Sequence, residues 1–495
     1  METFYAFVTK MAKKRKISLQ ALAQHCHIGR TTLYRIMKGE SRLTGDVERR
    51  LVSFLQLTEA EHSRMVAILA GREGTGDGDA DYLQAFAILD DLIYQQADSM
   101  SYRGFSGFAM FAQGEKYLRS FAEICQCLGQ ALRATTGSIV VYVQEAVDDA
   151  VFGMLEKILS LVVQAREPVE IYHFVNFPPQ QPAHCAETFK NCFQLMHHSG
   201  YQVYYHSDAP AQPAYQLLSD CLLMSFPTAE GRQHYMINLA RDDLSTCLTI
   251  ENEGSYSFLL SAFMRIKRSC KSADFRQLDL KDLNQEIASM EGRAPYALLQ
   301  NGLCPNMIPP CVQQRTMDIL STEEKAAIIL QFTGVMVQPY EVDHYAAYIL
   351  SEMEKRYQLG FQRKHYNIFS REGMMQFARK GTLAEFVSDI TYDVKQRKDT
   401  LQTLIRRLED PTDQVEVFVS ERNFASGLSI LASRGYGVQV DFVHPQRPDN
   451  QFNIVLHNPM IASLFFRYFS EYLPYKHLYS REKTKRFLQS LLESF

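Results

Sequence analysis

The sequence lacks a long hydrophobic run. Nowhere among its 495 residues do about 18 consecutive apolar residues occur, the length that a membrane-spanning helix requires. The first residues also lack the apolar segment of a signal peptide. We therefore expect no membrane partner. The ten cysteines form no compact disulfide framework, which favours reduced thiols and a cytoplasmic protein.

The sequence also lacks the short motifs that identify common enzymes. It has no phosphate-binding loop, paired metal motif, nucleophile elbow or kinase signature. The best candidate for a metal site consists of His184, Cys185, Cys192, His197 and His198, which are residue types that bind zinc. Two cysteines seven positions apart on a helix, however, more often lie buried in a core. We accordingly predict that the chain is not an enzyme and has no metal or cofactor site.

The most informative segment is residues 18–40, which predict two short helices joined by a tight turn. Ser18 is a suitable N-cap for the first helix, and the positions that follow it repeat an apolar face at helical spacing. Gly29 can open the second helix. The outward positions of that second helix are basic, hydroxylated or aromatic: Arg30, Thr31, Tyr34, Arg35 and Lys38.

This segment resembles the helix-turn-helix of the phage-repressor (Cro-like, or XRE) family. The matching positions are residues 22–24 (LAQ), Leu33, Ile36 and Lys38-Gly39-Glu40. The resemblance covers residues 2–69 and implies an all-α head that reads base edges from its second helix and touches phosphates nearby. The implied DNA-binding residues are Ser18, Arg30, Thr31, Thr32, Tyr34, Arg35 and Lys38.

Three features depart from the family pattern. His27 stands where glycine is usual and must adopt a left-handed conformation. Leu19 stands where glutamine often supports a phosphate contact. Ala12 and Met37 replace a common Arg–Glu pair between the first and third helices. The motif remains intact, but the detailed contacts of the family are expected to shift.

Charge is distributed unevenly along the chain. Residues 1–70 hold 12 lysines and arginines against 6 aspartates and glutamates, a net charge of +6, whereas residues 71–495 hold 40 against 50, a net charge of −10. A basic head on an acidic body suits a module that meets a polyanion. The alternative is a small helical bundle that contacts protein.

Four segments are expected along the chain: a helix-turn-helix domain at 1–70, a glycine-rich linker at 71–80, and body domains at 81–270 and 271–495. Helices are expected at residues 81–133, 148–165, 185–198, 256–267, 284–300 and 322–360, and residues 364–407 are expected to be mostly helical. Strands are expected at residues 138–143, 169–177, 201–206, 235–239, 246–250, 415–419, 437–443 and 452–456. This alternation of strands and helices predicts a large mixed α/β body. Gly200-Tyr-Gln-Val203 and Gly435-Tyr-Gly-Val438 echo one another, each read as a glycine that ends a helix before a strand. We therefore favour a duplicated sensor unit, although such junctions are common in α/β proteins.

These patterns together predict a cytoplasmic, sequence-specific transcriptional regulator whose body dimerises and senses an unidentified small-molecule or peptide effector. Double-stranded DNA is the expected partner. A homodimer is expected because a single recognition helix reads only a few base pairs. Two alternatives for the body of such a DNA-binding protein stay open: an enzyme whose state controls the head, and a protein-interaction scaffold.

Overall fold

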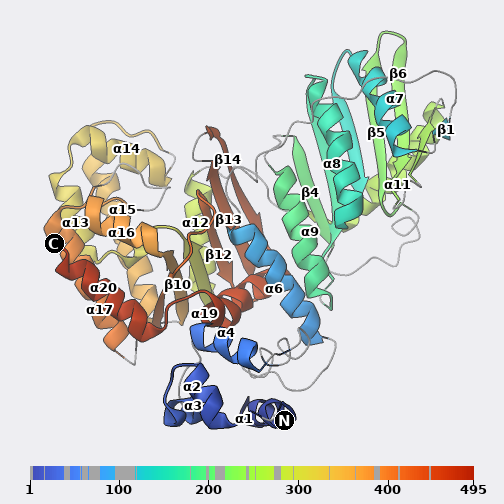
Figure 1. Cartoon of the computed structure of the whole chain (residues 1–495). Coiled ribbons are helices and arrows are strands. Elements are labelled where there is room, and N and C mark those ends of the chain that lie inside the picture. Colours follow the sequence, from blue (N-terminus) through green and yellow to red (C-terminus); the bar gives the residue numbers. More distant parts are fainter. Residues whose placement is uncertain are drawn as a thin grey trace. The chain divides into compact units, whose positions relative to one another are not determined.

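Figure 1 shows the computed structural model of the chain. The chain divides into two compact units. Unit 1 comprises residues 1–94, 278–446 and 462–495, and unit 2 comprises residues 95–277 and 447–461. The structure describes residues 4–15, 17–37, 45–55, 57, 65, 78–94, 117–118, 120–178, 180–196, 200–206, 218–240, 245–250, 252–272, 280–293, 295–333, 335–362, 364–383, 391–410, 413–444 and 447–495.

The unit boundaries differ from the domains expected at 81–270 and 271–495. Helix α6 (Gly78–Tyr94) begins inside the expected linker 71–80 and belongs to unit 1. Residues 447–461 belong to unit 2, although they come late in the sequence. Each unit is therefore assembled from segments that are not consecutive in the sequence.

Four helices make up most of what is described in the N-terminal segment: α1 (Phe4–Lys14), α2 (Leu19–His25), α3 (Arg30–Met37) and α4 (Gly45–Phe54). One apolar core joins them, and its fully buried members include Val8, Leu22, Leu33 and Leu51. Met65 is buried in the same core.

Unit 2 is built on a mixed sheet of eight strands in the order β1-β7-β6-β5-β2-β3-β4-β8. Three central strands are parallel, and the antiparallel β5, β6 and β7 continue the sheet from the side of β2. The strands are β1 (Tyr117–Leu118), β2 (Ile139–Gln144), β3 (Val169–Asn176), β4 (Tyr201–His206), β5 (Cys221–Thr228), β6 (Gly231–Asn238), β7 (Thr246–Thr249) and β8 (Lys271–Ser272).

Four helices accompany this sheet: α7 (Phe121–Arg133), α8 (Asp149–Gln164), α9 (Pro182–Leu195) and α11 (Glu253–Ser269). Ser120 and Glu123 form a capping box that starts α7. Phe263 of α11 packs on the sheet, with ring centroids 5.9 Å from Tyr142 and 6.2 Å from Phe174. Helix α11 therefore covers the face that carries these two aromatic residues.

The second sheet has six strands in the order β11-β10-β9-β12-β13-β14. Strands β9, β10 and β11 are parallel, β12 is antiparallel to β9, and β13 is antiparallel to β12. The strands are β9 (Tyr296–Gln300), β10 (His365–Ser370), β11 (Val415–Ser420), β12 (Leu428–Ser433), β13 (Gly437–His444) and β14 (Arg447–Leu456).

The helical segments that follow residue 279 in the chain are α12 (Leu280–Arg293), the 3-10 turn η2 (Pro305–Met307), α13 (Pro310–Ile319), α14 (Thr322–Thr333), α15 (Val342–Gln362), α16 (Arg371–Lys380), α17 (Val394–Glu409), α18 (Pro459–Arg467), the π-helical turn η3 (Tyr468–Tyr472), α19 (Leu473–Lys476) and α20 (Arg481–Glu493). Among the described residues, no helix is both long and apolar enough to cross a membrane. The body is thus a mixed α/β structure, as the sequence predicts.

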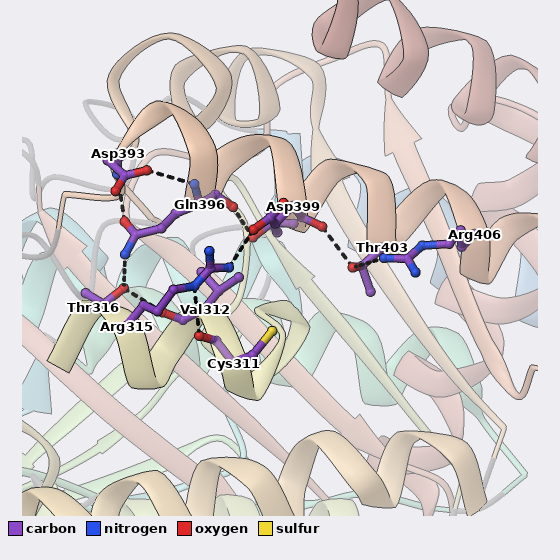
Figure 2. A network of polar contacts seen from close by, with 10 residues as sticks. Cys311, Val312, Arg315, Thr316, Asp393, Gln396, Asp399, Thr403 and Arg406 are labelled. Atoms are coloured by element: carbon purple, nitrogen blue, oxygen red, sulfur yellow. Dashed lines mark hydrogen bonds and ion pairs between the residues drawn. The ribbon is translucent and has the colours of Figure 1, made fainter. Parts of the chain in front are cut away.

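A polar network joins α13 to α17 in unit 1 (Figure 2). The Arg315 guanidinium lies 2.5 Å from the Asp399 carboxylate, and the Gln396 amide donates to the Thr316 hydroxyl at 3.1 Å. Gln396 also completes a capping box with Asp393 at the start of α17. One glutamine therefore both caps its own helix and fixes the neighbouring one.

The structure corrects several segments that the sequence predicted as helical. Residues 284–300 were expected to form one helix, but α12 ends at Arg293 and β9 begins at Tyr296, because Pro295 cannot continue the helical hydrogen bonding. The segment 364–407, expected to be mostly helical, begins with the buried strand β10. Strands β5 and β12 were not anticipated.

The echo between the glycines of residues 200 and 435 is also corrected. Gly435 has a positive φ of 71°, but it lies in the turn between β12 and β13 and does not follow a helix. Gly200 does lie between α9 and β4, but not in a left-handed conformation. A Cβ there would lie 1.8 Å from the Val169 carbonyl oxygen, so close backbone approach accounts for this glycine.

Candidate nucleic-acid interface

Helix α3 is held in the N-terminal core by its apolar side chains. Leu33, Ile36 and Met37 are at most 5% exposed. Because these positions fall three and four residues apart, they define one face of the helix and leave the opposite face outward. Their burial therefore fixes which side chains of α3 can meet another molecule.

The turn between α2 and α3 accommodates His27 without glycine. His27 has a φ of 53°, is exposed, and donates its backbone N–H to the Gln24 carbonyl at 3.0 Å. The Ile28 N–H closes the turn on the Ala23 carbonyl at 3.1 Å. A left-handed conformation costs a residue with a Cβ about 1 kcal/mol, so the turn keeps its geometry at a modest expense of stability.

The structure places four of the predicted DNA-binding residues in solvent on α3: Arg30, Thr31, Thr32 and Arg35. Tyr34 is half-buried. The Arg30 guanidinium lies 5.6 Å from the Tyr34 ring centroid, and the Tyr5 ring of α1 lies 6.1 Å from the same centroid. Tyr34 is thus held between α1 and Arg30, which restricts the rotamers of both side chains.

Tyr5 was not among the residues predicted from the sequence. It is 36% exposed and braces Tyr34 from a separate helix. Its signal in the sequence is an aromatic residue next to the apolar face of α1, a pattern too common to identify it without the structure.

Ser18 is the N-cap of α2 and already has one role there. Its Oγ accepts from the Ala21 N–H at 3.1 Å, while its side chain remains exposed. The hydroxyl hydrogen can be donated to a phosphate oxygen in addition. Lys38, the remaining predicted contact, lies outside the described residues.

The two other departures from the family pattern are apolar contacts in this structure. Ala12 and Met37 are each 2% exposed and belong to the same core. Leu19 is partly buried and packs against that core. The exposed lysines at the end of α1, Lys13 and Lys14, carry the basic character beyond α3.

The described residues hold no group of three or more His, Cys, Asp or Glu side chains that could hold a metal ion. Cys185 and Cys192 of the zinc candidate are both buried on α9, whereas His197 and His198 lie outside the described residues. The Cys185 thiol donates to the Pro178 carbonyl at 3.2 Å, which is a structural use of the side chain.

Comparison with known proteins gives little similarity. No family model matches the sequence, and no curated protein matches it. Among solved structures, the chain is similar to a phosphatidylserine synthase from Haemophilus influenzae Rd KW20, with 9% sequence identity, a TM-score of 0.22, and coverage of 84% of this chain and 97% of that one.

These comparisons correct the prediction of an effector-sensing transcriptional regulator. No family model of such a regulator matches the chain, and a solved structure that is similar to it is a phosphatidylserine synthase. We therefore do not assign regulation of transcription to the chain. At a TM-score of 0.22, the similarity assigns no activity in its place.

Proposed function

We propose that the N-terminal helices bind double-stranded DNA through the exposed face of α3. The observation that carries this proposal is that α3 has one buried apolar face and one exposed polar face. Leu33, Ile36 and Met37 lie in the core, and the arginines and threonines of the other side lie in solvent. An α-helix fits the major groove of B-DNA, where arginine can donate two hydrogen bonds to a guanine.

The individual side chains suit different parts of a duplex. Arg30 and Arg35 carry forked donors that match guanine O6 and N7, and Thr31 can contact a thymine methyl group or a base edge. Ser18 lies at the start of α2, where a hydroxyl can meet a phosphate. The proposal therefore assigns base contacts to α3 and backbone contacts to the residues that flank it.

Charge supports the same partner. The net charge of +6 in residues 1–70 attracts a polyanion, whereas the net charge of −10 in the rest of the chain repels one. Binding that uses several phosphate contacts weakens steeply as salt rises, because bound counterions are released. A protein partner contacted by a helical bundle lacks this steep dependence.

We also propose that the chain binds DNA as a homodimer and that its two α/β units arose by duplication. Support for duplication comes from strand pairing. β2, β3 and β4 are parallel, with β5 antiparallel to β2 and β6 antiparallel to β5. Strands β9 to β13 repeat these pairings in the same order.

The homodimer is supported by the small number of base pairs that a single recognition helix can contact.

The proposal is tested by selecting duplexes from a random library with the full-length chain. We expect enrichment of one short motif that occurs twice, with the two copies about one helical turn, or a multiple of it, apart. Equal retention of single-stranded DNA, or no retention of DNA at low salt, contradicts the proposal. A single enriched copy contradicts only the homodimer.

A further inference from the structure

The carboxyl end of β2 in the unit 2 sheet lies at a position where ligands bind in many α/β proteins. Strand β2 lies between the parallel β3 and the antiparallel β5, so the sheet order reverses at β2. In open α/β sheets, ligands bind outside the carboxyl ends of the strands at such a reversal. The residues that end β2 therefore lie where this class of fold most often binds small molecules.

Gln144 ends β2 with its carboxamide buried and unpartnered. The residue is 0% exposed, and neither its Nε2 nor its Oε1 has a hydrogen-bond partner among the described residues. Its counterpart at the end of β9 is Gln300, which donates to the Gly302 carbonyl at 3.0 Å. A buried polar group without a partner is destabilising. Gln144 thus lacks the internal bond that Gln300 has.

Further polar groups share the sheet face of Gln144. Alternate residues of a strand point to one face, and the register places Gln144 beside Phe174 and Asn176 beside His206. Asn176 is 8% exposed, and its Oδ1 has no partner among the described residues. Next along this face, the Cys270 Sγ lies 2.9 Å from the His206 Nε2.

The backbone around Gln144 is strained. Glu145, Ala146 and Asp220 all have left-handed φ values, of 55°, 59° and 56°. The Ala146 N–H donates to the Asp220 Oδ1 at 2.9 Å, so these three residues form one site. Non-glycine residues in this conformation persist only where surrounding contacts impose it, and they concentrate at ligand sites.

The buried side chain of His173 holds this backbone conformation through a hydrogen bond. His173 is fully buried, and its Nε2 donates to the Glu145 carbonyl at 2.5 Å. Its Nδ1 accepts from the Tyr201 hydroxyl at 2.6 Å. The resulting chain of hydrogen bonds holds the end of β2 in one position and leaves Gln144 fixed before any ligand binds.

We propose that Gln144 anchors a site for a small uncharged molecule with an amide-like edge, that is, an N–H donor next to a ring nitrogen or carbonyl acceptor. The carboxamide offers one donor and one acceptor and can pair with such an edge through two hydrogen bonds. Asn176 Oδ1 supplies a further acceptor. The carboxylates of Glu145 and Asp220 at this edge disfavour a phosphorylated ligand.

The test measures binding of adenosine, cytidine and nicotinamide to the full-length chain by calorimetry, with AMP as the phosphorylated comparison. At least one of the three uncharged probes binds saturably at one site, and AMP binds more weakly than adenosine. Gln144→Leu raises the dissociation constant at least tenfold. The control Gln164→Leu, on the exposed face of α8, leaves it unchanged.

Thermal unfolding of the same variants separates a ligand site from a structural role. Because Gln144→Leu removes an unpartnered buried group, the unfolding midpoint stays the same or rises. A lower midpoint shows that the carboxamide serves the fold and overturns the proposal. It is also overturned if none of the three probes binds, if Gln144→Leu binds equally well, or if AMP binds more tightly than adenosine. None of these outcomes bears on DNA binding by α3.

Discussion

Replacing Asp90 with alanine is expected to loosen α6 from the C-terminal helices of unit 1. The Asp90 carboxylate accepts hydrogen bonds from the Tyr468 hydroxyl, from Lys476 Nζ at 2.9 Å and from His477 Nε2 at 3.2 Å. Phe86 of the same helix packs against Tyr472, with ring centroids 5.1 Å apart. The carboxylate is the polar centre of this contact.

The magnitude follows from three contributions. Tyr468 is 0% exposed, and leaving its hydroxyl without an acceptor costs about 1–3 kcal/mol. The Lys476 side chain is 47% exposed, so its ion pair contributes less than about 1 kcal/mol. Alanine recovers about 0.5 kcal/mol through its helix propensity. The expected loss is about 2 kcal/mol, which corresponds to a roughly 30-fold larger equilibrium constant for local opening.

Hydrogen exchange of the α6 amides measures this opening without requiring two-state unfolding of the whole chain. The matched control is Asp91→Ala, because Asp91 is the adjacent, exposed residue of the same helix. Burial alone would raise the pKa of Asp90, but the hydrogen bond from His477 and the charge of Lys476 outweigh it and lower the pKa. The protection that Asp90 gives is therefore complete above the ordinary aspartate pKa and is lost as the pH falls below it. Equal exchange rates in Asp90→Ala and Asp91→Ala would refute this reasoning.

Two further predictions concern single histidines. His27→Gly should stabilise the N-terminal helices by up to about 1 kcal/mol, measured by the hydrogen exchange of α3, because glycine adopts the left-handed turn without strain; lower protection would contradict it. Burial lowers the pKa of His173 to about 4. Because the unfolded chain takes up this proton near pH 6.5 and the folded chain only near pH 4, unit 2 keeps its full stability above about pH 6.5. Between about pH 6.5 and 4 the free energy of unfolding falls by up to about 3 kcal/mol. His173→Gln should remove this pH dependence in the exchange of β3 amides, and an unchanged profile would contradict the assignment.

Local patterns predict the elements that are amphipathic on their own. The α2–α3 pair follows from Ser18, from the apolar spacing of Leu33 and Ile36, and from Gly29, since each acts through contacts within about one helical turn. The strand Tyr201–His206 is predicted with its observed bounds because its first four residues alternate between buried and more exposed positions.

Buried strands are harder to predict from one sequence. In β12, all six residues from Leu428 to Ser433 are buried, so no alternation distinguishes the strand from a helix. The unit boundaries depend on contacts between segments far apart in the chain, such as Asp90 with His477. The site around Gln144 likewise cannot be predicted from the sequence, because residues 144, 176 and 220 come together only at the carboxyl end of β2 in the folded sheet.

The most direct test of the central claim compares two arginine pairs on one DNA duplex. Fluorescence anisotropy at 0.1 M salt gives the dissociation constants of the full-length chain, of Arg30→Ala/Arg35→Ala, and of Arg265→Ala/Arg268→Ala. The second pair is exposed on α11 and removes the same charge. At about 1–3 kcal/mol for each base contact, the α3 variant should bind at least about 30-fold more weakly and the α11 variant less than about 3-fold. If the two variants lose affinity equally, or if the α3 variant loses none, α3 does not read DNA.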